Sequence, residues 1–364
     1  MTVILFIAIL AVLILVHELG HFLAAKKLGM RVDEFGIGFP PRLFSFKKGE
    51  TEYSINLIPL GGFVKIFGED PDLESISGSD SSRSLVNKPR WAQAIVMSAG
   101  VIFNIIFAWI LISIGLMSGM PMSVDQFNQE DIKDASVVLV GVMEDSPAFE
   151  SGLKVGDKIL FMESGDDSLQ NFNSDEMKEF ISNHGGQEID LLYKRGKTES
   201  AFATVIPVDG IIGEQYAIGI NMDNIGTVQF LPHVALWEGL KLTFGLIASI
   251  VVGLFALIAS LVQGTGDLSQ VTGPVGIVGL VGNAAEFGFI YLLSFTAFIS
   301  INLAVLNSIP FPALDGGRLL FIIIESVIRK NIKPVIANSL NLIGFVLLIT
   351  LMAAVTFNDI LKLF

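Results

Sequence analysis

The sequence His-Glu-Leu-Gly-His at residues 17–21 decides how the chain is interpreted, and an uncharged apolar run from Thr2 to Val16 precedes it. On a helix, positions i and i+4 share a face, so both imidazoles can reach one ion with Glu18 beside them. This is the H-E-x-x-H signature, in which two histidines bind zinc and the glutamate is the general base for a zinc-bound water. The alternative is a satisfied polar cluster at a helix end. It is less favoured, because such groups are costly in hydrocarbon unless they pair or bind an ion.

A catalytic zinc needs a third protein ligand and keeps a fourth position for water. The chain has no cysteine, so this ligand must supply nitrogen or oxygen. A candidate is Asp315, a hard oxygen donor within Asn-Ser-Ile-Pro-Phe-Pro-Ala-Leu-Asp-Gly-Gly at residues 307–317. Its prolines and glycines force irregular backbone, which at a membrane is tolerated only beside protein or a water-filled cavity. Taken alone, Asp-Gly-Gly is equally compatible with a helix-ending turn; the histidine motif favours the ligand.

The composition is typical of a polytopic α-helical membrane protein. Of the 364 residues, 52% are hydrophobic and 16% charged, and the mean hydropathy is +0.65. The loop 26–90 carries basic residues at both ends, which marks the cytoplasmic side and puts the N-terminus outside and the zinc motif toward the cytoplasm. Apolar stretches long enough to cross a bilayer are 2–25, 93–118, 242–262, 288–306 and 335–356.

Five crossings would put Asp315 on the side opposite His17 and His21, where it could not share their ion. Three ligands must meet within bonding distance of one metal. We therefore expect about four transmembrane helices, with residues 242–262 lying in the interface or dipping in without crossing.

An acidic segment separates the apolar stretches. Residues 119–235 hold 20 acidic and 7 basic side chains, which equals the net charge of −13 of the whole chain and argues against nucleic-acid binding. The segment has a strand-like run at 137–140, a Ser-Pro-Ala turn at 146–148 and Gly-Leu-x-x-Gly-Asp at 152–157. With a helix near 174–184 and a strand at 189–193, this resembles a PDZ domain, an α+β fold that binds extended segments by strand addition. We expect a membrane region at 1–118, the PDZ-like domain at 119–235 and a second membrane region at 236–364.

Two shorter features lie near the zinc motif in the sequence. The runs 53–57 and 62–66, around Pro59 and Gly61, predict a membrane-associated β-hairpin. It could offer an edge strand to an extended substrate, or be an ordinary surface hairpin. In the second apolar stretch, Gly100 and Asn104 lie four residues apart, which favours close helix packing over a catalytic role.

The motifs at 17–21 and 307–317, with a PDZ-like domain between them, resemble the site-2 protease family, of the bacterial RseP/RasP type. The likeness covers essentially the whole chain, including Pro-Leu-Gly-Gly-Phe-Val-Lys at 59–65. Members similar to RseP carry two PDZ domains, whereas this chain shows one.

The resemblance implies an intramembrane zinc metalloprotease. By motif, His17, His21 and Asp315 would bind Zn²⁺, Glu18 would be the catalytic base, and Asn307 would steady the substrate or the oxyanion. The substrates implied are single-pass transmembrane proteins, such as anti-sigma factors, or signal-peptide remnants, held in the lipid bilayer. The localisation implied is the bacterial inner membrane, with the active site toward the cytoplasm and the PDZ domain outside.

Two other classes of protein compete with a protease. A catalytically silent, membrane-anchored PDZ scaffold would not need Glu18, which is intact. A zinc transporter or sensor usually shows repeated halves and several ligand sites, and the sequence contains no internal repeat and a single such site. Zinc content together with cleavage of a transmembrane substrate would separate the three.

Overall fold

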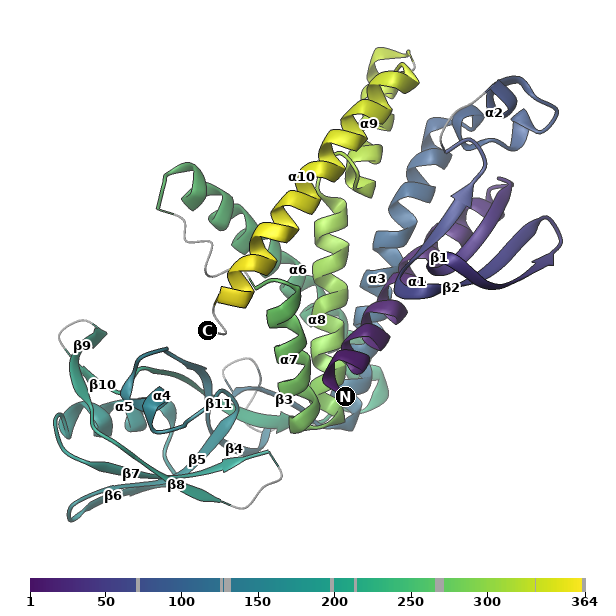
Figure 1. Ribbon diagram of the computed structural model, residues 1–364. Coiled ribbons are helices and arrows are strands. Elements are labelled where there is room, and N and C mark those ends of the chain that lie inside the picture. Colours follow the sequence, from purple (N-terminus) through teal and green to yellow (C-terminus); the bar gives the residue numbers. More distant parts are fainter. Residues whose placement is uncertain are drawn as a thin grey trace. The chain divides into compact units, whose positions relative to one another are not determined.

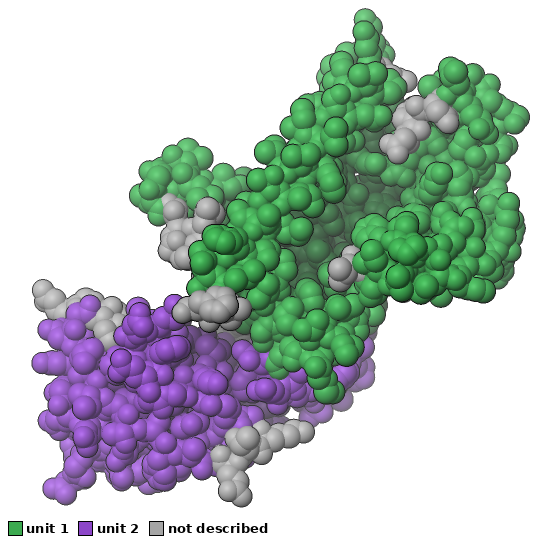
Figure 2. Space-filling model, in the orientation of Figure 1, with its two compact units in different colours: residues 1–112, 238–282, 295–364 green, residues 113–237, 283–294 purple. Residues whose placement is uncertain are grey.

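The computed structural model describes residues 1–69, 73–124, 127, 132–196, 200–212, 215–265, 272–330 and 332–361. The chain forms two compact units, shown in separate colours in Figure 2. Unit 1 comprises residues 1–112, 238–282 and 295–364, and unit 2 comprises residues 113–237 and 283–294. The division at residues 118 and 235 stays a prediction, because the two units are defined by contacts within the chain and not by a bilayer.

Within the described ranges, five helices are long and apolar enough to cross a membrane: α1 (Thr2–Lys27), α3 (Arg90–Ser118), α6 (Pro232–Val262), α8 (Phe289–Ser308) and α10 (Pro334–Leu361) (Figure 1). The chain is thus a multi-pass helical protein with a β-rich part. The shorter helices α7 (Pro274–Phe287) and α9 (Asp315–Ile328), which lie between the long ones, were not predicted. Pro274 begins α7, because proline fits the first position of a helix.

Small residues bring α1 and α3 into close contact. A Cβ atom on Gly20 would lie 2.8 Å from the carbonyl carbon of Ala99. Next to this contact, a buried apolar cluster joins the end of α1 to the start of α3. The cluster includes Ala25, Met30 and Val96. This packing fixes the last turns of α1, which carry the histidine motif.

A two-stranded antiparallel sheet follows α1. It consists of β1 (Val32–Lys48) and β2 (Thr51–Ile66). Residues 32–37 of β1 pair with 62–66 on one side and with 52–55 on the other. The predicted pairing between 53–57 and 62–66 is therefore wrong, since both runs pair with β1. A central strand satisfies the backbone groups of both runs, which a hairpin of the two alone would leave half unpaired.

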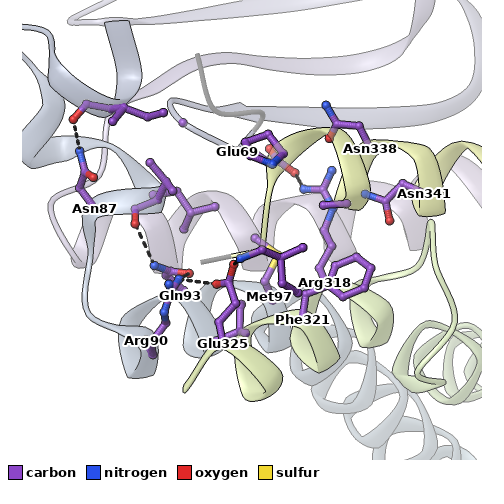
Figure 3. Close-up of a pocket in the computed structure, with 18 residues that line it drawn as sticks. Glu69, Asn87, Arg90, Gln93, Met97, Arg318, Phe321, Glu325, Asn338 and Asn341 are labelled. Carbon is purple, nitrogen blue, oxygen red and sulfur yellow. Dashed lines mark hydrogen bonds and ion pairs between the residues drawn. The ribbon is translucent and has the colours of Figure 1, made fainter. Parts of the chain in front are cut away.

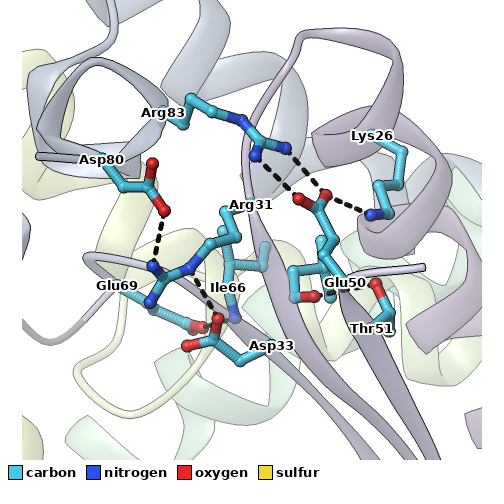
Figure 4. A network of polar contacts seen from close by, with 10 residues as sticks. Lys26, Arg31, Asp33, Glu50, Thr51, Ile66, Glu69, Asp80 and Arg83 are labelled. Atoms are coloured by element: carbon cyan, nitrogen blue, oxygen red, sulfur yellow. Dashed lines mark hydrogen bonds and ion pairs between the residues drawn. The ribbon is translucent and has the colours of Figure 1, made fainter. Parts of the chain in front are cut away.

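An ion-pair network ties this sheet to α1 and to the short helix η1 (Ser81–Arg83) (Figure 4). Glu50, in the turn between β1 and β2, accepts hydrogen bonds from Lys26 at 2.5 Å and from Arg83 at 2.7 Å. Arg31 donates to Asp80 at 2.9 Å. The helix α2 (Leu73–Ser77) and the short helix η2 (Leu85–Asn87) complete the connection to α3.

A buried carboxylate joins α10 to α7 within unit 1. Asp359, near the end of α10, accepts from the backbone N–H groups of Gly273 at 3.0 Å and Gly276 at 2.8 Å. These groups have no partner inside their own helix, so the carboxylate satisfies them and complements the helix dipole.

Unit 2 contains a seven-stranded sheet in the order β3-β11-β4-β5-β7-β8, with β6 paired to β5. The strands are β3 (Met120–Ser123), β4 (Ile132–Val142), β5 (Asp157–Ser164), β6 (Asp167–Gln170), β7 (Ile189–Arg195), β8 (Ala201–Val205) and β11 (Ile220–Val228); β9 (Val208–Ile212) and β10 (Gln215–Ala217) pair separately. The helices are α4 (Pro147–Glu150) and α5 (Ser174–Asn183). Helix α5 and strand β7 lie where the sequence predicts them.

Candidate metal centre

Asp315 reaches the two histidines of α1 because the chain turns sharply between α8 and α9. Helix α8 ends at Ser308, and α9 begins at Asp315 after an extended Leu314. A Cβ atom on Gly316 would overlap the backbone of Ser308, and one on Gly317 would lie 2.6 Å from the carbonyl carbon of Phe311. The glycines therefore permit the tight return of the chain. The alternative of a helix-ending turn is wrong, since Asp315 starts a helix.

Three ligand atoms converge at this point. His17 and His21 lie on one face of α1 with 9% and 7% of their surface exposed. Asp315 Oδ2 lies 3.0 Å from His17 Nε2 and 3.3 Å from His21 Nε2, and the two Nε2 atoms are 3.2 Å apart. The structure thus brings the three predicted ligands together.

The donor set fits a zinc ion. A tetrahedral zinc with bonds of roughly 2.0–2.1 Å places its ligand atoms roughly 3.3 Å apart, close to the separations seen here. Asp315 Oδ2 is buried and has no hydrogen-bond partner within the described residues. Two imidazole lone pairs and a carboxylate oxygen repel one another unless a cation or a proton lies between them.

A backbone carbonyl of α3 leaves the imidazole of His21 free to bind a metal ion. His21 Nδ1 donates to the carbonyl oxygen of Val96 at 2.8 Å, so its Nε2 keeps a lone pair toward the site. On α3, a Cβ atom at Gly100 would lie 2.7 Å from His17 Cε1 and would overlap His21 Nε2. Sequence reasoning assigned Gly100 to packing and did not identify Val96. Gly100 and Asn104 are four residues apart in the sequence, and this spacing could have indicated that both lie on the face of α3 that contacts the histidines.

Glu18 lies in the same cavity, which has a volume of about 220 Å³. The edge of β2 passes above this glutamate: a Cβ atom on Gly62 would lie 3.4 Å from Glu18 Cγ. Asn307 is half-buried in the last turn of α8 and is not among the described residues that line the cavity. The lining residues are His17, Glu18, His21, Phe63, Val64, Ile66, Glu69, Met97, Ala313, Asp315 and Arg318.

A second cavity of about 250 Å³ adjoins the first (Figure 3). The two share Glu69, Met97 and Arg318, and Glu69 forms an ion pair with Arg318. Carboxamides gather on the walls of the second cavity; they belong to Asn87, Gln93, Asn338 and Asn341. Polar groups therefore extend from the metal site toward the start of α3 and α10.

The sequence model of peptidase family M50 matches residues 5–351 of this chain. The chain belongs to peptidase family M50. Its M50 relatives include a candidate zinc metalloprotease of Clostridium perfringens, 38% identical over 96% of this chain and 95% of that protein. The zinc metalloprotease RasP of Oceanobacillus iheyensis is 30% identical over 100% of this chain and 99% of that protein. The regulator of sigma-W protease RasP of Bacillus subtilis is 30% identical over the same shares. A PDZ domain of an SdrC-like protein from Listeria innocua aligns at 23% identity over 24% of this chain and 92% of that domain, with a TM-score of 0.21.

Membership of family M50 confirms the resemblance to site-2 proteases. The chain is an intramembrane zinc metalloprotease, and Zn²⁺ is its cofactor. Its apolar helices and its family make it a multi-pass membrane protein. A silent scaffold and a transporter are both less consistent with these findings.

Proposed function

We propose that His17, His21 and Asp315 hold the zinc ion of this M50 protease and that Glu18 is its general base. The observation that carries the proposal is the convergence of three buried ligand atoms within 4.8 Å of one another. Asp315 is far from both histidines in the sequence, so its meeting with them follows from the fold and not from local sequence.

The reaction is hydrolysis of a peptide bond by water. A bound zinc ion supplies Lewis acidity, which brings the pKa of water toward neutrality and polarises a carbonyl. Glu18 takes one proton from the attacking water, whose oxygen forms a bond to the carbonyl carbon of the peptide. The C–N bond then breaks, and Glu18 returns the proton to the leaving amine. Asn307 lies outside the cavity lining, so we assign it to steadying the substrate and not the reacting atoms.

The substrates we propose are membrane-spanning segments of single-pass proteins, such as anti-sigma factors or signal-peptide remnants. Carbonyls in a helix are hydrogen-bonded, so the segment must unwind before attack. Residues 62–66 of β2 pair with β1 on one side, and Phe63 and Val64 line the metal cavity. An extended substrate can pair with the other side of this run and reach Glu18.

We propose four full spans, α1, α3, α8 and α10. In unit 1, α8 runs in the same direction as α1, so the chain after α8 reaches the end of α1 that carries His21 (Figure 1). Helices α6 and α7 then enter the bilayer and return together, because α7 has only 14 residues. This keeps the predicted partial insertion of 242–262. The active site faces the cytoplasm in the bacterial inner membrane, and residues 119–235 form a PDZ-like domain outside.

Cysteine labelling tests the topology, since the chain has no native cysteine. Asn283→Cys and Gly210→Cys replace exposed residues and should react with a membrane-impermeant maleimide from the outer face. Gly49→Cys, in the exposed turn of the β1–β2 sheet, should react only after the membrane is opened. Labelling of Asn283→Cys and Gly210→Cys from opposite faces would overturn this layout.

The chemistry is tested on the purified protein with a model transmembrane substrate. Glu18→Gln should retain zinc while its turnover falls by roughly 100-fold or more, the contribution of a general base. His17→Ala and Asp315→Ala should lose both zinc and cleavage. Unchanged turnover in Glu18→Gln would show that the general base is another group.

A further inference from the structure

The second ring nitrogen of His17 faces a buried carboxamide. Asn104 on α3 is 0% exposed, and its Nδ2 atom lies 3.4 Å from His17 Nδ1. The partner of Nδ1 decides which nitrogen of a neutral imidazole carries the proton. For His21 that partner is the carbonyl of Val96, which can only accept. For His17 it is a side chain that can either donate or accept.

With its amide nitrogen toward His17, Asn104 donates to Nδ1 and the proton of His17 lies on Nε2. This arrangement blocks metal binding at Nε2. It also leaves Asn104 Oδ1 buried without a hydrogen-bond partner within the described residues. A half-turn of the carboxamide exchanges oxygen for nitrogen at almost no cost in shape. Oδ1 then accepts from Nδ1–H, and the lone pair of Nε2 faces His21 and Asp315.

The backbone holds Asn104 in place independently of its side chain. Gly100 and Asn104 are four apart on α3, so both face α1. From α8, Ser300 Oγ donates to the backbone carbonyl of Asn104 at 2.9 Å. The carboxamide is therefore positioned by two helices while its own torsion remains free to choose an orientation.

We propose that Asn104 is a positioning residue for zinc, which accepts a hydrogen bond from His17 Nδ1–H and so fixes the imidazole tautomer that binds the metal. The inference rests on the ligand set proposed above. Partners of this kind on metal-binding histidines typically change metal affinity by roughly 10–100-fold when removed.

The test measures the zinc dissociation constant of the full-length, detergent-solubilised protein by competition with a chelator. Asn104→Leu keeps a similar volume without an acceptor, and we expect it to bind zinc roughly 10–100-fold more weakly. Asn104→Asp keeps the acceptor and should bind zinc at least as tightly as wild type. Ser294→Ala on α8, which removes a hydroxyl bonded to the carbonyl of Ile290 in the same helix, should bind as wild type does.

A zinc affinity of Asn104→Leu equal to that of wild type would overturn the inference. Should Asn104→Leu not fold, a more than tenfold loss in Asn104→Asp would overturn it, because the amide N–H and not the acceptor would then matter. A Co²⁺ spectrum adds a readout of ligand geometry: Asn104→Leu should alter the d–d bands and Ser294→Ala should not. Zinc binding that survives His17→Ala would instead refute the proposed ligand set, which keeps the two failures distinct.

Discussion

Gly100 and His21 lie so close together that a Cβ atom on Gly100 would overlap His21 Nε2. An alanine methyl group would occupy the space that the proposed ligands share. We expect Gly100→Ala to lose bound zinc, as measured by elemental analysis after dialysis. Gly253→Ala on α6, where a Cβ atom meets nothing within 4 Å, is the matched control and should keep a full complement of zinc. A fully loaded Gly100→Ala protein would contradict the proposed site.

Asp359 should stabilise the fold through the first turn of α7. Asp359→Ala leaves the N–H groups of the buried Gly273 and the half-buried Gly276 without this acceptor. An unsatisfied buried group costs about 1–3 kcal/mol of unfolding free energy. The midpoint of thermal unfolding in detergent should therefore fall. Thr356→Val is the control, because within the described residues that hydroxyl donates to the carbonyl of Met352 in its own helix. Equal midpoints in the two variants would contradict a stabilising role for the carboxylate.

Acid should weaken the connection between α1 and the β1–β2 sheet. Hydrogen bonds from Arg83 and Lys26 lower the pKa of the Glu50 carboxyl from 4.5 to about 2. Because the folded-state pKa lies below the unfolded one, the stabilisation is complete above pH 4.5 and is lost as the pH falls toward 2. Glu50→Gln should lower the unfolding midpoint at neutral pH and flatten its dependence on pH in this window. A variant with the pH dependence of wild type would show that another group controls acid sensitivity.

The PDZ-like domain should act as a size filter on substrates, since we place it outside the membrane and the zinc toward the cytoplasm. A deletion of residues 125–223 joins Val124 directly to Asn224. The pairing of β3 with the second half of β11, which begins at Ser123 and Ile225, is therefore kept. The shortened protein should hold zinc normally and cleave full-length substrates that the intact protein spares. Electrophoresis of cleavage products checks this.

The opposite outcome has a defined meaning. If the deletion lowers cleavage of short substrates and never admits long ones, the domain captures substrates and does not exclude them. The net charge of −13 over residues 119–235 would then favour basic partners, and added salt should weaken that capture.

The sequence was sufficient for features that depend on near neighbours along the chain. Helical periodicity places His17 and His21 on one face whatever surrounds them. Apolar length identifies the long helices, and the two motifs identify the protease family and its metal. Asp315 could be chosen as the third ligand because chemistry requires one more oxygen or nitrogen donor and no cysteine exists.

Features that depend on distant partners were decided by the tertiary structure. The strand pairing was mispredicted because β1, and not the neighbouring run, supplies the partner for both halves of β2. Helix α7 was missed because its glycines and proline suggest a break, while Asp359 from α10 satisfies its first turn. Val96, Gly100 and Asn104 meet the histidines only because α3 packs within backbone contact of α1. Local preferences determine where each helix forms, but the free energy of packing between helices determines which faces meet. Only that packing brings the proposed metal ligands together.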